Sequence, residues 1–151
     1  MIKIICIGKI KEQFYREAIQ EYLKRLSKYT KIELIELNDI NNDNINIILE
    51  KERDEILSKI KEKEYIITLE IEGKELDSIE LSNKINELQI KNSNITFIIG
   101  GSYGIHNDIK NMSNYKLSFS KLTFPHQLFR VMLLEQIYRS YKILNNETYH
   151  K

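Results

Sequence analysis

The sequence predicts an α/β domain with a mainly parallel sheet flanked by helices. Short apolar runs, rich in β-branched residues, alternate along the chain with longer segments whose apolar residues recur at helical spacing. Strands separated by helices pair in parallel, because each helix carries the chain back to the same end of the sheet. The chain has 151 residues, a common domain size, and we expect a single domain over residues 1–151.

The first third of the chain predicts two strands joined by a helix. Residues 2–7 form a continuous apolar run ending at Gly8, which is typical of a buried parallel strand. Residues 32–37 form the second strand, and residues 11–28 form the helix between them. The expected inner face of this helix consists of residues spaced four apart, namely Phe14, Ala18, Tyr22 and Leu26.

The middle of the chain predicts a loop, a helix and a third strand. Residues 38–46 are rich in Asn and Asp and predict an exposed loop, to which we assign no function. A helix is expected over residues 45–63 and a strand over residues 65–71, followed by a turn at residues 72–74. The expected inner residues of the helix are Ile45, Ile48, Leu49, Ile56 and Ile60.

The remaining segments continue the alternation. They predict a helix over residues 78–91, whose inner residues include Ile85 and Leu88. After it we expect a strand over 95–99, a short helix after Ile105, a strand over 115–119 and a last helix over 125–144. Pro125 suits the first turn of the last helix, with Thr123 as its N-cap. That helix is apolar on more than one side, so either the protein encloses it or a partner shares it.

Composition narrows the class of protein. Hydrophobic residues make up 42% and charged residues 30% of the chain, and no apolar stretch approaches the ~20 residues of a membrane span. The N-terminus has no signal-peptide pattern, and the one cysteine, Cys6, suits a reducing cytoplasm. Residues 110–151 contain seven Lys and Arg against two Asp and Glu, a basic excess that can attract phosphate-rich partners.

Ligands of open α/β sheets bind beyond the carboxyl ends of the strands. Three predicted loops meet that description: one after residues 69–71, one after Ile99, and residues 119–124. The second contains the sequence GGSYG from Gly100, which is either a ligand loop or a tight turn and lacks the dinucleotide-binding spacing. The three histidines, His106, His126 and His150, and Cys6 form no metal-binding spacing, so no metal is expected.

Several sequence blocks together resemble a known family. They are the opening IKIICIGKIKEQF, then LEIEGKELDS, FIIGGSYG, and LSFSKLTFPHQLFRVMLLEQIYRSYKI with the terminal YHK. The resemblance extends over essentially the whole chain, and the last block is the most specific. The chain resembles the bacterial large-subunit (23S) ribosomal RNA pseudouridine N3-methyltransferases, small members of the SPOUT superfamily. The resemblance implies a C-terminal trefoil knot, a homodimer with the cofactor pocket near the subunit interface, and S-adenosylmethionine as cofactor.

The resemblance also assigns a cofactor pocket. By motif match its residues are Leu69, Gly100, Phe119, Ser120, Lys121, Leu122, Thr123 and Phe124. Backbone groups in such loops can read the edges of an adenine, a glycine admits close approach, and apolar side chains cover the ring.

The implied reaction transfers a methyl group to N3 of a pseudouridine in a ribosomal RNA hairpin loop, with the assembled ribosome as the expected substrate. Because N3 carries a proton at neutral pH, the reaction needs that proton removed. Our hypothesis is that His150 or His126 helps to remove it and that Arg139 and Arg130 hold phosphate or the developing negative charge. Tyr149 would stack on the base. Thr148 stands where many relatives have proline before the Tyr-His pair, which makes the tail less rigid.

Two other functions fit the residues without the resemblance. The first is a non-catalytic dimeric RNA-binding α/β module, with its basic C-terminal face on RNA and its last helix in the dimer. The second is a nucleotide-binding enzyme of another class that uses the glycine turn for phosphate. Titration with S-adenosylmethionine separates both from a methyltransferase.

Overall fold

The computed structural model describes residues 1–91 and 94–151, which are built around a five-stranded sheet of order β2-β1-β4-β3-β5. Every pairing in this sheet is parallel, which confirms the predicted fold class. The strands are β1 (Ile2–Ile7), β2 (Ile32–Leu37), β3 (Tyr65–Glu75), β4 (Ile95–Ile99) and β5 (Tyr115–Ser118).

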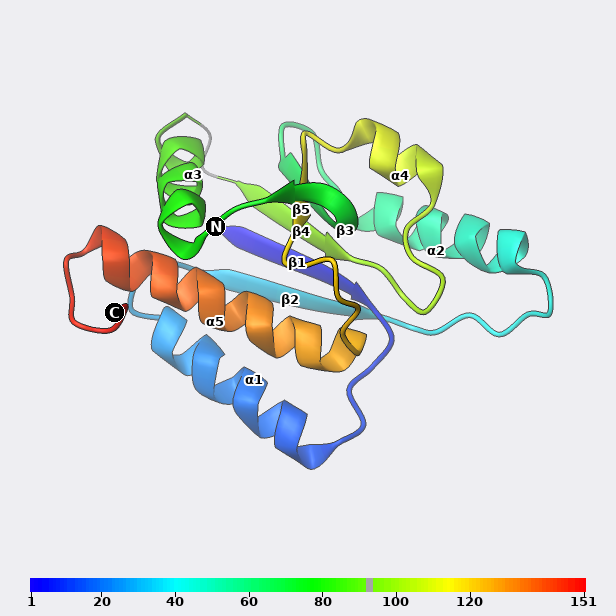
Figure 1. Ribbon diagram of the computed structural model, residues 1–151. Coiled ribbons are helices and arrows are strands. Elements are labelled where there is room, and N and C mark those ends of the chain that lie inside the picture. The colour runs from blue at the N-terminus through cyan, green and yellow to red at the C-terminus, as the bar shows by residue number, and fades with distance from the viewer. Residues whose placement is uncertain (92–93) are drawn as a thin grey trace.

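Helices cover both faces of the sheet (Figure 1). They are α1 (Gln13–Leu26), α2 (Ile45–Lys59), α3 (Ser78–Lys91), α4 (Asn107–Met112) and α5 (His126–Leu144). On one face Ile2, Ile4 and Cys6 of β1 pack in a core with α1, α3 and α5, whereas Ile5 and Ile7 pack on the other face with α2 and α4. Burial on both faces explains why β1 is a continuous apolar run. No helix in the described ranges is long and apolar enough to cross a membrane.

The predicted buried faces of α1 and α2 are wrong in the first turn of each helix. Phe14 of α1 is 64% exposed, because the buried face of this helix follows Tyr15, Ile19 and Leu26 instead. Ile45 of α2 is 48% exposed at the start of that helix. Both helices are also shorter than predicted, and α2 ends at Lys59.

The predicted turn at residues 72–74 is wrong, because β3 runs on through it to Glu75. The register with β5 shifts between Leu69 and Lys74, so the intervening residues bulge out of the ladder. Gly73 makes this possible, since a Cβ at that position would lie 2.7 Å from the carbonyl oxygen of Lys116 in β5. The bulge therefore sits at a close approach of β3 to β5, at the carboxyl end of the predicted strand.

Helix α5 begins at His126, one residue later than expected, with Pro125 in the N-cap position. Thr123 is therefore not the N-cap, and it precedes the helix in the loop after β5. From this start α5 crosses the sheet beside α1 and α3 (Figure 1), and Leu133, Leu134 and Ile137 are fully buried. The protein itself thus encloses most of the helix's apolar surface. The strand order and the return of α5 are consistent with the expected trefoil knot.

Candidate active site

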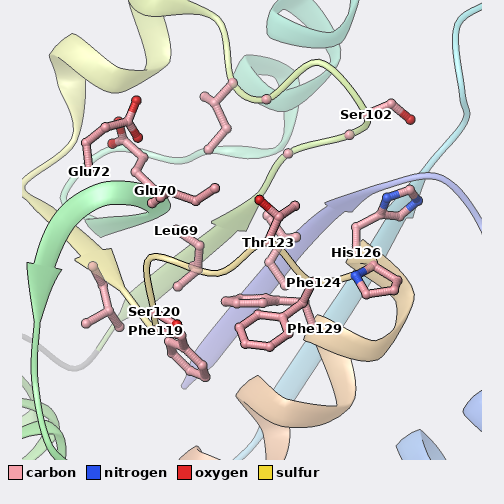
Figure 2. A pocket seen from close by; sticks show the side chains of 18 of the residues that line it. Leu69, Glu70, Glu72, Ser102, Phe119, Ser120, Thr123, Phe124, His126 and Phe129 are labelled. Carbon is pink, nitrogen blue, oxygen red and sulfur yellow. The ribbon is translucent and has the colours of Figure 1, made fainter.

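A cavity of about 480 Å³ lies beyond the carboxyl ends of β3, β4 and β5 (Figure 2). All three loops predicted to bind a ligand contribute to its wall. Of the eight residues expected around the cofactor, seven line this cavity, namely Leu69, Gly100, Phe119, Ser120, Leu122, Thr123 and Phe124. Lys121 lies between lining residues but is exposed and is not part of the wall. The structure therefore brings together segments that are far apart in the sequence.

The glycine turn after β4 forms one wall, and at Gly100 it is packed too tightly for a side chain. A Cβ on Gly100 would lie 2.6 Å from the carbonyl oxygen of Gly104, a distance that real Cβ atoms do not reach. Gly104 has a φ of +83°, and its amide donates a hydrogen bond of 3.1 Å to the Gly101 carbonyl. The turn presents backbone, rather than side chains, to the cavity at Gly100.

Three phenylalanines contribute aromatic rings to the apolar part of the wall (Figure 2). The ring of Phe129, in the first turns of α5, lies 4.7 Å from that of Phe119 and 6.4 Å from that of Phe124 between ring centroids. Rings arranged in this way cover a flat heteroaromatic group and exclude water from it. The cavity is therefore suited to an adenine-containing ligand.

Polar groups stand at both ends of this apolar wall. Figure 2 shows Glu70 and Glu72 at one end and His126 at the other, and all three line the cavity. Burial lowers the pKa of His126, the nearby Arg130 charge lowers it further, and Asp39 partly opposes the change. A neutral imidazole at pH 7 can accept a proton, so His126 retains the property that a general base needs.

Arg130 has a different environment from the one that its expected role requires. It is 1% exposed, and its guanidinium donates to Glu36 Oε2 at 2.9 Å and to the Ile7 carbonyl at 2.7 Å. These bonds fix the start of α5 to the carboxyl ends of β1 and β2. A guanidinium enclosed in this way does not reach an RNA phosphate, so the structure supports a positioning role for Arg130.

The predicted C-terminal residues do form a cluster. Arg139 Nη2 donates to Glu135 Oε1 at 2.5 Å, and the Tyr149 hydroxyl donates to the same oxygen at 3.0 Å. Arg139 Nη1 lies 3.1 Å from His150 Nδ1, and its guanidinium carbon lies 4.8 Å from the centroid of the Tyr149 ring. Burial and the hydrogen bond to Glu135 raise the pKa of Tyr149 to about 12, so its phenol stays protonated.

This C-terminal cluster is separated from the cavity of its own chain. His126 and Arg139 stand near opposite ends of α5, about 20 Å apart at a rise of 1.5 Å per residue. Between them runs an open groove of about 530 Å³. Glu135, the acceptor of the cluster, lines this groove together with Val131 and Met132, and Phe119 lines both the groove and the cavity.

Some cavity residues escaped the sequence analysis. Glu70 and Glu72 face the cavity because of the β3 bulge. This bulge depends on contact with β5, so the sequence around these two residues does not predict it. Lys110 comes from α4, and Phe129 comes from the first turns of α5. For Phe129 a signal existed, since it lies three positions after His126 and shares a helical face with it.

Comparison with known proteins identifies the family of the chain. The family described as "Predicted SPOUT methyltransferase" matches residues 1–150. The chain is 54% identical to the ribosomal RNA large subunit methyltransferase H of Clostridium tetani, with 99% of each chain covered. It is 52% identical to the protein of the same name from Clostridium novyi, again over 99% of each. Among solved structures, a probable methylase family protein from Haemophilus influenzae shares the fold, with a TM-score of 0.57 at 11% identity, covering 99% of this chain and 70% of the other.

Proposed function

Because this chain belongs to the SPOUT methyltransferase family, we propose that it methylates N3 of a pseudouridine in 23S ribosomal RNA with S-adenosylmethionine as donor. The single observation that carries the proposal is the cavity at the ends of β3, β4 and β5, which gathers seven of the eight expected cofactor residues. The relatives' shared name as large-subunit ribosomal RNA methyltransferases, at 52–54% identity over 99% of the chain, supports the substrate. A ribosomal substrate supports the expectation of a cytoplasmic protein.

The cavity residues have separate tasks in this reaction. S-adenosylmethionine supplies an electrophilic methyl group when bound. Phe119, Phe124 and Phe129 would cover its adenine ring, and the backbone at Gly100 would lie against it. Holding donor and acceptor in line supplies much of the rate enhancement in such transfers. A base near N3 supplies the rest by accepting the proton.

His126 and His150 are the two candidates that we propose for the base. His126 lines the cavity and has a lowered pKa, which favours the neutral, proton-accepting imidazole. His150 is exposed and lies beside Arg139, whose permanent positive charge suits an RNA phosphate or a developing anion. Tyr149 would stack on a base once its contact with Glu135 is released.

A homodimer would bring these two groups of residues together. The C-terminal cluster lies about 20 Å along α5 from the cavity of its own chain, so it can contribute to methyl transfer in a neighbouring subunit. The groove that Val131 and Met132 line is mainly apolar, adjoins the cavity through Phe119, and is open to a partner. The proposed assembly is a dimer joined through α5.

Transfer of labelled methyl groups from S-adenosylmethionine to purified ribosomes tests the proposal. We expect label in 23S RNA from ribosomes that lack the modification, and none when the ribosomes already carry it. RNA binding without any methyl transfer would instead favour the non-catalytic RNA-binding module.

A His150→Ala variant tests the tail in the same assay. If His150 is the base, its turnover falls by about 10²–10⁴ while its affinity for S-adenosylmethionine stays unchanged. His106→Ala is the matched control, because His106 caps α4 and bonds to Asp108, away from the tail. Normal turnover of His150→Ala would eliminate His150 as the base.

A further inference from the structure

Glu70 is a buried carboxylate in the wall of the cavity. Its side chain is only 7% exposed, although glutamate is seldom buried without a compensating partner. It directly follows Leu69, at the point where β3 leaves its ladder with β5. In Figure 2 its side chain stands at the end of the cavity opposite His126.

The two carboxylate oxygens of Glu70 have different surroundings. Oε2 accepts a hydrogen bond of 2.6 Å from the Thr68 hydroxyl, which in turn lies 2.9 Å from the Ser113 hydroxyl. Oε1 is 3.8 Å from the ammonium of Lys110, which is an ion-pair distance but too long for a hydrogen bond. Thr68 thus fixes the carboxylate, while Oε1 keeps its capacity to accept a hydrogen bond or to face a cation.

The charged groups around the cavity leave it with an excess of negative charge. Glu70 and Glu72 line it as acids, and Lys110 lines it as a base. His126 adds no charge at neutral pH, because its pKa is lowered from the ordinary value. A charge inside a wall that excludes water interacts more strongly with a ligand than a charge on the surface.

We infer that Glu70 makes the cavity discriminate between the cationic sulfonium of the methyl donor and the neutral thioether of the product. This rests on the proposed function. In the transfer, the S–CH₃ bond breaks with its electron pair left on sulfur, the N3–CH₃ bond forms, and the N3 proton passes to the base. The ligand in the cavity loses one positive charge in that step. Its attraction to the Glu70 carboxylate falls accordingly, which favours exchange of product for a new donor.

Calorimetric titration of the full chain with S-adenosylmethionine and with S-adenosylhomocysteine tests this inference. We expect Glu70→Gln to weaken binding of the sulfonium about tenfold and to leave binding of the thioether within about twofold. Glu75→Gln is the matched control, because it removes an exposed charge from the same strand outside the cavity. That control should leave both affinities unchanged.

Lys110→Met is a second variant, for which we expect the preference for the sulfonium to change in the opposite direction. It removes the cation that competes for Glu70 and should increase the preference for the sulfonium about threefold. An equal weakening of both ligands by Glu70→Gln, or an unchanged preference in both variants, would overturn the inference. A wild-type protein that binds neither ligand would contradict the proposed function itself.

Discussion

Two buried ionisable side chains outside the cavity lie behind its walls. Arg130 ties the start of α5 to β1 and β2 through the Ile7 carbonyl and Glu36. Glu52 of α2 is 6% exposed and packs behind the glycine turn, with Oε2 3.3 Å from where a Cβ would stand on Gly101. Neither role was predicted, although Glu52 lies one helical turn from both Ile48 and Ile56, on the buried face of α2.

Glu52 makes stability depend on pH. Burial raises its pKa to about 7, and the nearby charges of Asp39 and Glu55 add to the effect. Because the folded state then binds a proton that the unfolded state has released, the free energy of unfolding falls as pH rises from about 4.5 to 7.

The Glu52→Gln variant should lose this dependence. Across that interval the wild type should lose on the order of 1–3 kcal/mol relative to the variant, as followed by urea denaturation at pH 5 and pH 8. Glu50→Gln on the exposed face of α2 should keep the wild-type slope. Parallel pH profiles for wild type and Glu52→Gln would contradict the assignment.

Among the elements, the glycine turn between β4 and α4 is the part of the site most sensitive to small changes. Gly100→Ala places a Cβ against backbone atoms of Gly104 at 2.6 and 2.7 Å, so the turn has to open. We expect the affinity for S-adenosylmethionine to fall at least about tenfold, with a loss of stability of about 1–3 kcal/mol.

The Gly104→Ala variant separates the effect of steric crowding, expected for Gly100→Ala, from the effect of backbone strain. A Cβ there meets no atom within 4 Å, but φ of +83° is strained for alanine. This variant should lose about 1–2 kcal/mol of stability with a smaller effect on affinity. Calorimetry and thermal unfolding measure both quantities, and equal affinity losses in the two variants would argue against a specific role for crowding at Gly100.

Local sequence patterns were sufficient to predict most helices and strands. They were insufficient where contacts between distant segments of the chain determine the structure. The apolar run of β1 and the strand before Gly100 gave correct bounds, because a buried parallel strand has a distinct composition. The residues Glu72-Gly73-Lys74 have the composition of a turn, but packing of Gly73 against Lys116 keeps them in β3. The partner that buries Arg130 comes from β2, far away in the sequence.

At the scale of the whole molecule, the residues that we propose for the site lie toward the two ends of α5. The cavity lies at its N-terminal end, and the cluster of Arg139, Tyr149 and His150 lies near its C-terminal end. The groove between them predicts that the active protein is a dimer, which would place a tail from one subunit near the cavity of the other.

Light scattering after size-exclusion chromatography measures the assembly. We expect a mass twice the 18.0 kDa of one chain for the wild type and a shift toward the monomer for Met132→Lys, which places a charge in the groove. Ile90→Lys is the control, since Ile90 is 77% exposed on α3 and does not line the groove. A monomeric wild type at micromolar concentration would contradict the assembly.

Methylation of a ribosomal pseudouridine is most directly tested by mass spectrometry of 23S RNA from cells that lack the gene. The N3-methylpseudouridine signal should disappear and should return when the wild-type gene is supplied, whereas supply of the Gly100→Ala variant should restore it poorly. An unchanged N3-methylpseudouridine signal in cells without the gene would contradict the proposed function.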